Sequence, residues 1–377
     1  MNTKSRLITF ILLTVFLCSF FIPVYAVSDI SAAAAVLMEA SGRNVLTEKN
    51  AHQQMPMAST TKIMTAIVAI EKCTNLSAPV QISENAIGIE GSSVYLKVGE
   101  VLSMEQLLYA LLLESANDAA AAIAIEIAGD IPLFAEMMNE KAALLGMKNT
   151  HFTNPHGLDD AEHYTTAYDL ALLACHALEN PLFRKISSTY KATIPMNNGE
   201  GNRVLINHNR LLNTYHGAIG IKTGYTRRCG RCLVSAAERN GVTMVAVTLS
   251  APDDWNDHTR LLDYGFSQYT SVRLAEVGEY QFNLPCLGSY TETVQIANRD
   301  AVSVSLHHSH GAINVTVEAP HYLCAPIISG QNIGTLIFRC DNREIARIPL
   351  CAVTSAEPIQ QKNSCTDRLK NLFGIFR

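Results

Sequence analysis

The chain has 377 residues, of which 48% are hydrophobic, 17% charged and 7% aromatic. These proportions exclude intrinsic disorder, a low-complexity fibre and a coiled coil, and the length predicts two or three domains. With 29 Lys and Arg against 34 Asp and Glu, the net charge is −5; nucleic acid is not expected as a partner, because binding phosphates requires a basic surface.

The N-terminal segment predicts export. Lys4 and Arg6 precede an apolar run over residues 7–22, and small residues at Val24-Tyr25-Ala26 suit a cleavage site. This layout is typical of a secretory signal peptide at 1–26, cleaved after Ala26. An uncleaved membrane anchor is the alternative, because the run is almost long enough to span a bilayer.

The cysteines leave their chemistry open. Ten occur, and loss of Cys18 with the signal leaves an odd number. Cys229-Gly-Arg-Cys232 is a single CxxC pair, which is either a redox or metal pair or two buried small hydrophobic residues, and one pair cannot fill a zinc site alone. Residues 151–163 hold three histidines without an HExxH motif. No metal site and no cofactor are expected.

The first half of the mature chain predicts short strands and then helices. A turn at residues 40–44 separates two apolar runs, which favours a hairpin. Residues 119–128 are apolar on every helical face and are expected in the core. The expected elements are strands at 32–38 and 44–48, helices at 59–72, 103–145 and 166–178, and a loop at 150–165.

Beyond Ile219 the pattern predicts strands. Two apolar runs flank Asn240-Gly241, a dipeptide typical of tight hairpin turns, and a helix at 257–264 is expected to lie on that sheet. From residue 272, alternating runs between turn residues predict a small all-β domain. The expected division is a signal peptide at 1–26, a first domain at 27–271, a β-rich domain at 272–354, and a linker with a C-terminal helix at 355–377.

Residues 367–377 form an amphipathic pattern. Leu369, Leu372, Phe373 and Phe376 recur at helical spacing, with basic residues between them. Such a segment suits the surface of an anionic membrane, and an ordinary helix docked on protein fits the pattern equally well.

Three short motifs carry candidate chemistry, and the first is Ser59-Thr-Thr-Lys62 at the start of a predicted helix. Residues three apart share a helix face, so the Lys62 amine is expected to reach the Ser59 hydroxyl. A serine needs a neighbouring base, and lysine is a base only when burial and positive charge lower its pKa. Alone the motif is weak, because Ser188-Thr-Tyr-Lys191 repeats it by chance.

The other two motifs are Ser115-Ala-Asn117, after an apolar helix, and Lys222-Thr-Gly224, at the start of the strand-forming half. The serine can relay a proton, the second lysine adds a cation, and glycine leaves room for substrate backbone. Each motif alone is more often structural than functional. Together, in this order, they are the motif set of class A β-lactamases and penicillin-binding proteins.

The surrounding residues make the similarity more specific. The chain resembles the D-alanyl-D-alanine carboxypeptidases, the low-molecular-mass penicillin-binding proteins of the serine peptidase S11 family, over essentially the whole mature length. The similarity rests on residues 57–65, 111–119, 152–159, 220–226 and 261–266. It implies a mixed α/β (α+β) fold, with a β-lactamase-like catalytic domain whose antiparallel sheet is flanked by helices, followed by a small all-β domain.

The resemblance also implies a role for each motif residue. Ser59 is the expected acylated nucleophile, Lys62 its general base and Ser115 a proton relay. The expected substrate-binding residues are Asn117, Lys222, Thr223 and Gly224. The backbone N–H groups of Ser59 and Tyr225 are the expected oxyanion hole.

The implied reaction releases the terminal D-alanine from peptidoglycan stem pentapeptides, through an acyl-enzyme that water hydrolyses. β-Lactam antibiotics are the implied covalent inhibitors. The protein is expected outside the cytoplasm, attached peripherally to the outer face of the cell membrane through its C-terminal helix.

Two departures and two alternatives accompany the resemblance. Ile219-Gly220 stands where members often have Asp-Gly, and Asp254 stands where many have an arginine, so carboxylate recognition is expected to rest more on Lys222 and Thr223. One alternative is a β-lactamase, whose deacylating glutamate has no convincing counterpart beyond Glu179. The other is a catalytically silent scaffold that binds the cell wall.

Overall fold

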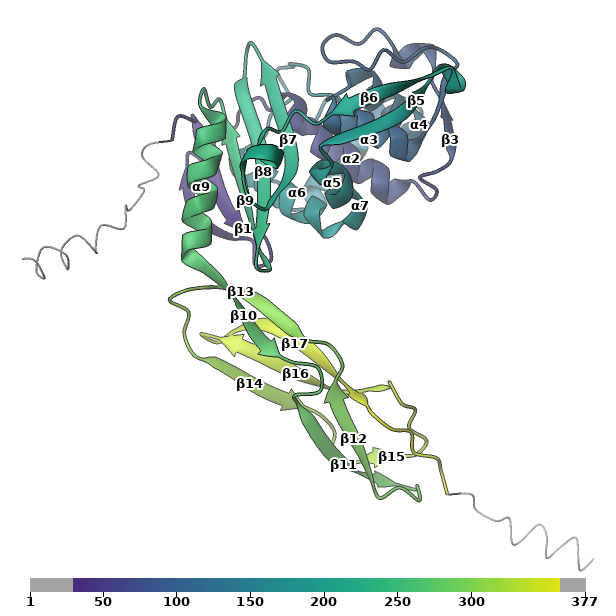
Figure 1. Ribbon diagram of the computed structural model, residues 1–377, viewed down its shortest axis with the longest axis vertical. Coiled ribbons are helices and arrows are strands. Elements are labelled where there is room, and N and C mark those ends of the chain that lie inside the picture. The colour runs from purple at the N-terminus through teal and green to yellow at the C-terminus, as the bar shows by residue number, and fades with distance from the viewer. Residues whose placement is uncertain (1–29, 360–377) are drawn as a thin grey trace, which may run out of the picture. The chain divides into compact units, whose positions relative to one another are not determined.

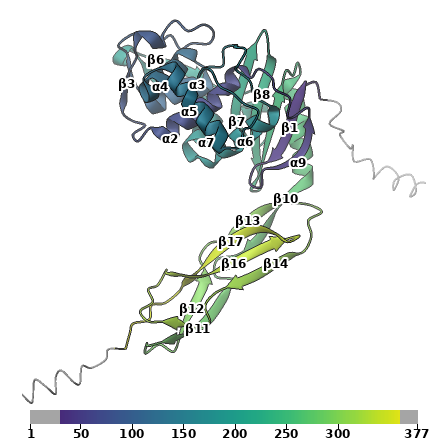
Figure 2. The same ribbon diagram turned by 180° about the vertical axis from the view of Figure 1, so that it is seen from behind.

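The computed structural model describes residues 30–359 (Figures 1 and 2). The expected signal peptide and residues 360–377 of the expected C-terminal segment lie outside the described residues. By its internal contacts the chain divides into two compact units, one ending at Gln268 and the other beginning at Tyr269.

A five-stranded antiparallel sheet forms the centre of the first unit. Its order is β2 (Asn44–Lys49), β1 (Ala34–Glu39), β9 (Val242–Leu249), β8 (Gly230–Arg239) and β7 (Ala218–Thr226). Strand β1 is buried at all six positions, as expected of a strand covered on both faces. Figure 1 shows α9 (Asp254–Gln268) on one face of the sheet, whereas α6 (Ala167–Glu179) lies on the other.

The predicted β8–β9 hairpin is confirmed. Asn240 and Gly241 connect the strands with φ values of 51° and 79°, the left-handed conformation that a type I′ turn requires. Arg239 pairs with Val242 directly across the turn. The following helix begins at Asp254, three residues earlier than predicted.

Helices and short hairpins fill the side of the sheet opposite α9 (Figure 2). The helix predicted over 103–145 is three helices, because Ser115 adopts φ 59° and Gly129 adopts φ 88°, which end the first two. Helix α4 buries its alanine-rich first two turns, and α2 is buried from Lys62 to Ala69. The elements here are η2 (Ala58–Thr61), α2 (Lys62–Lys72), β3 (Pro79–Gln81), η3 (Glu84–Ala86), β4 (Val101–Ser103), α3 (Met104–Leu113), α4 (Asn117–Ala128), α5 (Ile131–Leu144), α7 (Pro181–Ser188), β5 (Lys191–Met196), η4 (Asn197–Gly199) and β6 (Gly201–Ile206). The short helix α8 (Leu211–Thr214) precedes β7, and Tyr215 at its end donates a hydrogen bond to Asp263 of α9.

The second unit is built of strands, as the alternating pattern predicts. Six strands form one sheet in the order β14-β16-β17-β12-β11-β15, and β10 pairs with β13. Its main core contains Ile296, Phe338 and Leu350. The strands are β10 (Tyr269–Ala275), β11 (Gln281–Leu287), β12 (Thr293–Asn298), β13 (Val302–His307), β14 (Ile313–Glu318), β15 (Leu323–Cys324), β16 (Asn332–Cys340) and β17 (Arg343–Ala352).

Candidate active site

Ser59 sits in a short 3₁₀ turn, η2, that leads directly into α2. Two side-chain hydrogen bonds fix this turn: Thr60 Oγ1 donates to the Met57 carbonyl at 2.6 Å, and Thr61 Oγ1 donates to the Ala58 carbonyl at 2.7 Å. Ala58, with φ 46°, holds a left-handed conformation that is costly for a residue with a side chain. Strained backbone of this kind is concentrated at functional sites.

Lys62 brings three parts of the chain together. Its Nζ lies 2.9 Å from Ser59 Oγ, and it donates to Asn117 Oδ1 and to the His156 carbonyl, each at 2.6 Å. The side chain is completely buried. The predicted contact between Lys62 and Ser59 is therefore present, and the His156 carbonyl is an additional partner that spacing did not reveal.

The surroundings favour a neutral Lys62. Burial lowers the pKa of Lys62 well below its usual value, because the charged form loses its hydration, and the positive charge of Lys222 lowers it further. The carboxylate of Asp118 acts in the opposite direction and is the weakest of the three effects. These are the conditions under which a lysine serves as a base.

The turn between α3 and α4 places the second motif beside the first. Ser115 adopts φ 59°, and it lies in the wall of the cleft with 5% of its surface exposed. Asn117 is the first residue of α4; its Oδ1 accepts from Lys62, and its Nδ2 donates to the Glu90 carbonyl. Both ends of the amide are thus engaged, which holds Asn117 against Lys62.

Strand β7 supplies the third motif. Lys222 is buried and donates from Nζ to the Thr223 carbonyl at 2.9 Å, and burial lowers its pKa to about 7 although Glu114 opposes the effect. A Cβ atom on Gly224 would lie 3.1 Å from the Met57 carbonyl oxygen and 3.2 Å from the Ser59 nitrogen. Glycine therefore allows β7 to pass close to the turn that carries Ser59.

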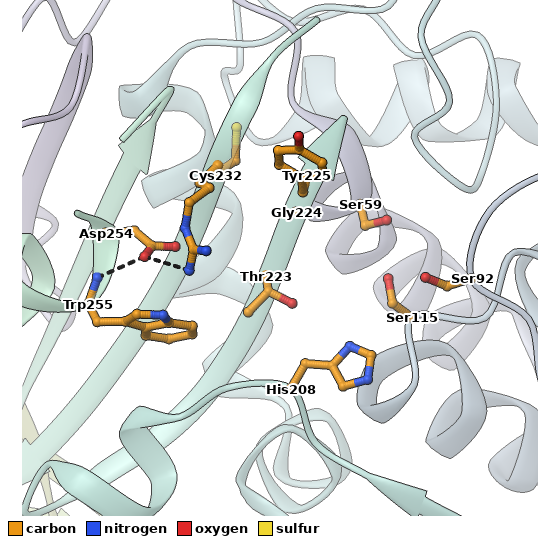
Figure 3. A pocket seen from close by; sticks show the side chains of 11 residues that line it. Ser59, Ser92, Ser115, His208, Thr223, Gly224, Tyr225, Cys232, Asp254 and Trp255 are labelled. Carbon is orange, nitrogen blue, oxygen red and sulfur yellow. Dashed lines mark hydrogen bonds and ion pairs between the residues drawn. The ribbon is translucent and has the colours of Figure 1, made fainter. Parts of the chain in front are cut away.

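A cavity of about 320 Å³ lies between these elements. Figure 3 shows Ser59, Ser92 and Ser115 on one side of it and Thr223 on the facing strand. The lining residues are Ser59, Ser92, Ser115, His208, Thr223, Gly224, Tyr225, Arg231, Cys232, Asp254 and Trp255. The cavity thus joins residues from all three predicted motifs.

Several lining residues were not singled out as site residues from the sequence. Ser92 and His208 lie in segments without a recognised motif, and the only sequence signal at Arg231 is its place between the cysteines of the CxxC pair. His156, whose carbonyl accepts a hydrogen bond from Lys62, belongs to the family-like segment 152–159, and that similarity is a sequence signal for its place at the site. Asp254 was identified as a departure, and the structure places it at the cavity beside Trp255 (Figure 3).

The CxxC pair lies at the edge of this cavity. Cys229 and Cys232 are both buried and, like the other six cysteines that the structure describes, are free thiols. A hydrogen bond between the two thiols lowers the pKa of Cys229 and raises that of Cys232. Burial agrees with the interpretation of both as small hydrophobic residues.

Residues 30–359 contain neither a candidate metal site nor a candidate membrane-spanning helix. No group of three or more His, Cys, Asp or Glu side chains in this part of the chain is arranged to hold a metal ion. No helix there is long and apolar enough to cross a membrane.

Known proteins match both the sequence and the fold. The family model of D-alanyl-D-alanine carboxypeptidase, peptidase S11, matches residues 23–253. The D-alanyl-D-alanine carboxypeptidase DacF of Bacillus subtilis is 32% identical over 330 residues, which cover 85% of each chain.

Solved structures agree. PBP3 of Streptococcus pneumoniae, described as a peptidoglycan synthesis regulatory factor, is 25% identical with a TM-score of 0.73 and covers 87% of this chain and 100% of that one. Penicillin-binding protein 5 of Haemophilus influenzae is 27% identical with a TM-score of 0.63, covering 87% and 98%. The predicted fold class, a helix-flanked antiparallel sheet with a second β domain, is confirmed. The chain belongs to the D-alanyl-D-alanine carboxypeptidases of the peptidase S11 family.

Proposed function

We propose that this protein is a serine-type carboxypeptidase that releases the terminal D-alanine from peptidoglycan stem pentapeptides through an acyl-enzyme on Ser59. Family membership supports the reaction class. The observation that carries the proposal is the 2.9 Å contact between the Ser59 hydroxyl and the buried amine of Lys62.

The contacts of Lys62 favour proton transfer from Ser59. A neutral amine has two N–H bonds and one lone pair, and Asn117 Oδ1 and the His156 carbonyl accept both N–H bonds. The lone pair is left for the Ser59 hydroxyl, which then donates its proton to Lys62. The resulting alkoxide attacks the carbonyl carbon of the penultimate D-alanine.

The oxyanion that forms needs hydrogen-bond donors. The backbone N–H groups of Ser59 and Tyr225 are our candidates, and the close approach at Gly224 supports them because it brings β7 next to the Ser59 nitrogen. When the C–N bond breaks, the departing D-alanine amine takes a proton from Lys62, with Ser115 as the relay. Water then hydrolyses the ester, with Lys62 again as base.

Lys222 and Thr223 are our candidates for binding the terminal carboxylate. The Thr223 hydroxyl faces the cavity (Figure 3). The buried amine of Lys222, the preceding residue of β7, supplies positive charge in its protonated form. Asn117, expected from the sequence to bind substrate, also positions Lys62, because its Oδ1 accepts from the amine and its Nδ2 is held by the Glu90 carbonyl. Binding substrate would require Nδ2 to leave the Glu90 carbonyl.

The same attack on a strained lactam carbonyl makes β-lactams covalent inhibitors of Ser59. Fast release of that adduct, as in a β-lactamase, requires a second base near the acyl group. Glu179 does not line the cavity and pairs instead with Arg43 at 3.1 Å on the surface. This geometry favours the carboxypeptidase over the β-lactamase, and the complete set of motif side chains disfavours a silent scaffold.

We also propose a location and a domain division from the sequence. Residues 1–26 direct export, residues 27–271 are catalytic, residues 272–354 form the β domain, and residues 367–377 bind the outer face of the membrane through their basic amphipathic pattern. Truncation after Asn363 should release the exported protein from membranes without lowering turnover of a soluble peptide. Continued sedimentation with membranes would refute the C-terminal anchor.

The function is tested with purified protein and a synthetic stem pentapeptide ending in D-Ala-D-Ala. We expect stoichiometric release of free D-alanine by the wild type and none by the Ser59→Ala variant. The Ser188→Ala variant is the matched control, because Ser188 opens the second SxxK sequence and should be dispensable. Equal release by the Ser59→Ala variant would contradict the proposal.

A further inference from the structure

A guanidinium group lines the cavity, and the roles proposed above do not use it. Arg231 Nη2 lies 2.9 Å from Asp254 Oδ1, and the guanidinium carbon lies 5.8 Å from the centre of the Trp255 ring. Asp254 is almost completely buried, whereas 44% of the Arg231 side chain is exposed. The arginine is therefore held from one side and open to the cavity on the other.

The strand register places Arg231 on the substrate side of the β7–β8 hairpin. Arg231 pairs directly with Tyr225, and Thr223 lies two residues before Tyr225 in β7, so the three side chains share one face of the sheet. Diagonal neighbours of this kind have their backbones roughly 7–8 Å apart, within reach of a long side chain. A carboxylate bound at the Thr223 hydroxyl thus lies within reach of the arginine.

We propose that Arg231, positioned by Asp254 and Trp255, binds the terminal carboxylate of the substrate together with Thr223. This proposal rests on the proposed carboxypeptidase function. Many members of the family have an arginine at the position of Asp254, the first residue of α9. In this chain that position holds an acid, and the proposal places the guanidinium on β8 instead.

The chemistry of Lys222 and Arg231 supports a role for the arginine in binding the carboxylate. Lys222 is buried and has a pKa of about 7, so it is only partly charged at neutral pH. Arginine keeps its charge at every physiological pH and presents paired N–H groups that match a carboxylate. The ion pair with Asp254 runs through Nη2, and 44% of the Arg231 side chain is exposed, which leaves guanidinium N–H groups accessible to a ligand.

Asp254 is well placed to hold the arginine. Its Oδ1 also accepts the backbone N–H of Trp255 at 3.0 Å, within the first turn of α9. An acid is favourable at a helix N-terminus, where the backbone N–H groups point outward. The helix thus fixes the carboxylate, and the carboxylate fixes the guanidinium.

The test compares acylation of Ser59 by benzylpenicillin, which has a free carboxylate, and by its neutral methyl ester. We expect the Arg231→Leu variant to lose about tenfold to a hundredfold in the acylation rate with the free acid, in line with one charge-assisted hydrogen bond, and to keep the rate with the ester. Arg231→Lys should recover part of the loss. Arg227→Leu, with the same charge change in the exposed turn of this hairpin, should behave as wild type.

A double variant makes the test sharper. The double variant Arg231→Leu, Asp254→Arg removes the guanidinium from β8 and places one at the start of α9. It should restore part of the preference for the free acid. An equal fall in both rates, or an unchanged preference in Arg231→Leu, would overturn the role of Arg231 while leaving the function intact. Absence of any adduct on the wild type would instead refute the proposed function, and with it this inference.

Discussion

Lys62 Nζ and Ser59 Oγ lie 2.9 Å apart, and the lysine that makes this contact is completely buried. A buried amine without a carboxylate partner at hydrogen-bond distance is stable only when neutral, because its charge has lost water and gained too little in return. The two carbonyl oxygens around Nζ satisfy its N–H bonds. The fold therefore maintains a base beside a hydroxyl.

The Lys62→Ala variant tests this relationship. Without the base, we expect acylation of Ser59 by benzylpenicillin to slow about 10²–10⁴-fold, the usual contribution of a general base. Stopped-flow or quenched-flow rates measure the change, and a thermal melt verifies that the variant is folded. An acylation rate like that of the wild type would mean that another group removes the proton.

The pH profile tests the coupling between the two lysines. Acylation requires neutral Lys62, so its rate should rise with pH as Lys62 loses its proton. The positive charge of Lys222 lowers the pKa of Lys62, so Lys222→Met should raise that pKa and move the acidic limb of the profile to higher pH. Arg227→Met, which removes an exposed cation nearby, is the control. A limb that stays in place or moves to lower pH would contradict the account.

Gly157 tests the packing behind the nucleophile. It adopts φ 87°, and a Cβ atom there would lie 2.0 Å from the Ala58 carbonyl oxygen. We expect Gly157→Ala to lower the free energy of unfolding by about 3 kcal/mol or more and to slow acylation, because Ala58 precedes Ser59.

Gly146→Ala is the matched control for this change. Gly146 has a similar φ of 76° but no heavy atom within 4 Å of the added Cβ. It should lose only about 1–2 kcal/mol for the left-handed conformation and keep its acylation rate. Urea unfolding and penicillin acylation measure both variants, and equal effects would show that the clash with Ala58 is relieved at no cost.

A buried ion pair supports the loop that borders the cavity. Arg203 donates from Nη2 to Glu100 Oε2 at 2.9 Å and from Nε to the Val94 carbonyl at 2.7 Å. Because truncation would leave a buried carboxylate without this partner, Arg203→Ala should cost about 3–5 kcal/mol in unfolding free energy.

The exposed pair of Arg43 and Glu179 provides the comparison. Arg43→Ala should cost less than about 1 kcal/mol, because water already screens that pair. Chemical denaturation of the two variants under identical conditions gives both values. A cost for Arg203→Ala as small as that for Arg43→Ala would refute the structural role of the buried pair.

Local chemistry made part of the fold predictable. Asn240-Gly241 identified a hairpin because few other dipeptides adopt two left-handed residues in succession. The three-residue spacing of Ser59 and Lys62 predicted their contact, even though the turn between them is 3₁₀ and not α-helical. In both cases the signal lies within a few residues of the chain.

Contacts between distant segments were not predictable in this way. The break at Ser115 depends on a backbone conformation that an apolar pattern does not encode, so three helices were predicted as one. The partnership of Arg231 and Asp254 joins a strand to a helix 23 positions later in the chain. Nothing in their spacing indicates that an arginine on β8 accompanies the acid on α9.

The most direct test of the central claim is mass spectrometry of the intact protein after exposure to benzylpenicillin, with sequencing of the modified peptide. The account predicts one covalent adduct for each chain, located on Ser59, which is lost in Ser59→Ala and slow to form in Lys62→Ala. An unmodified wild-type protein, or an adduct on a different residue such as Ser115, would contradict it.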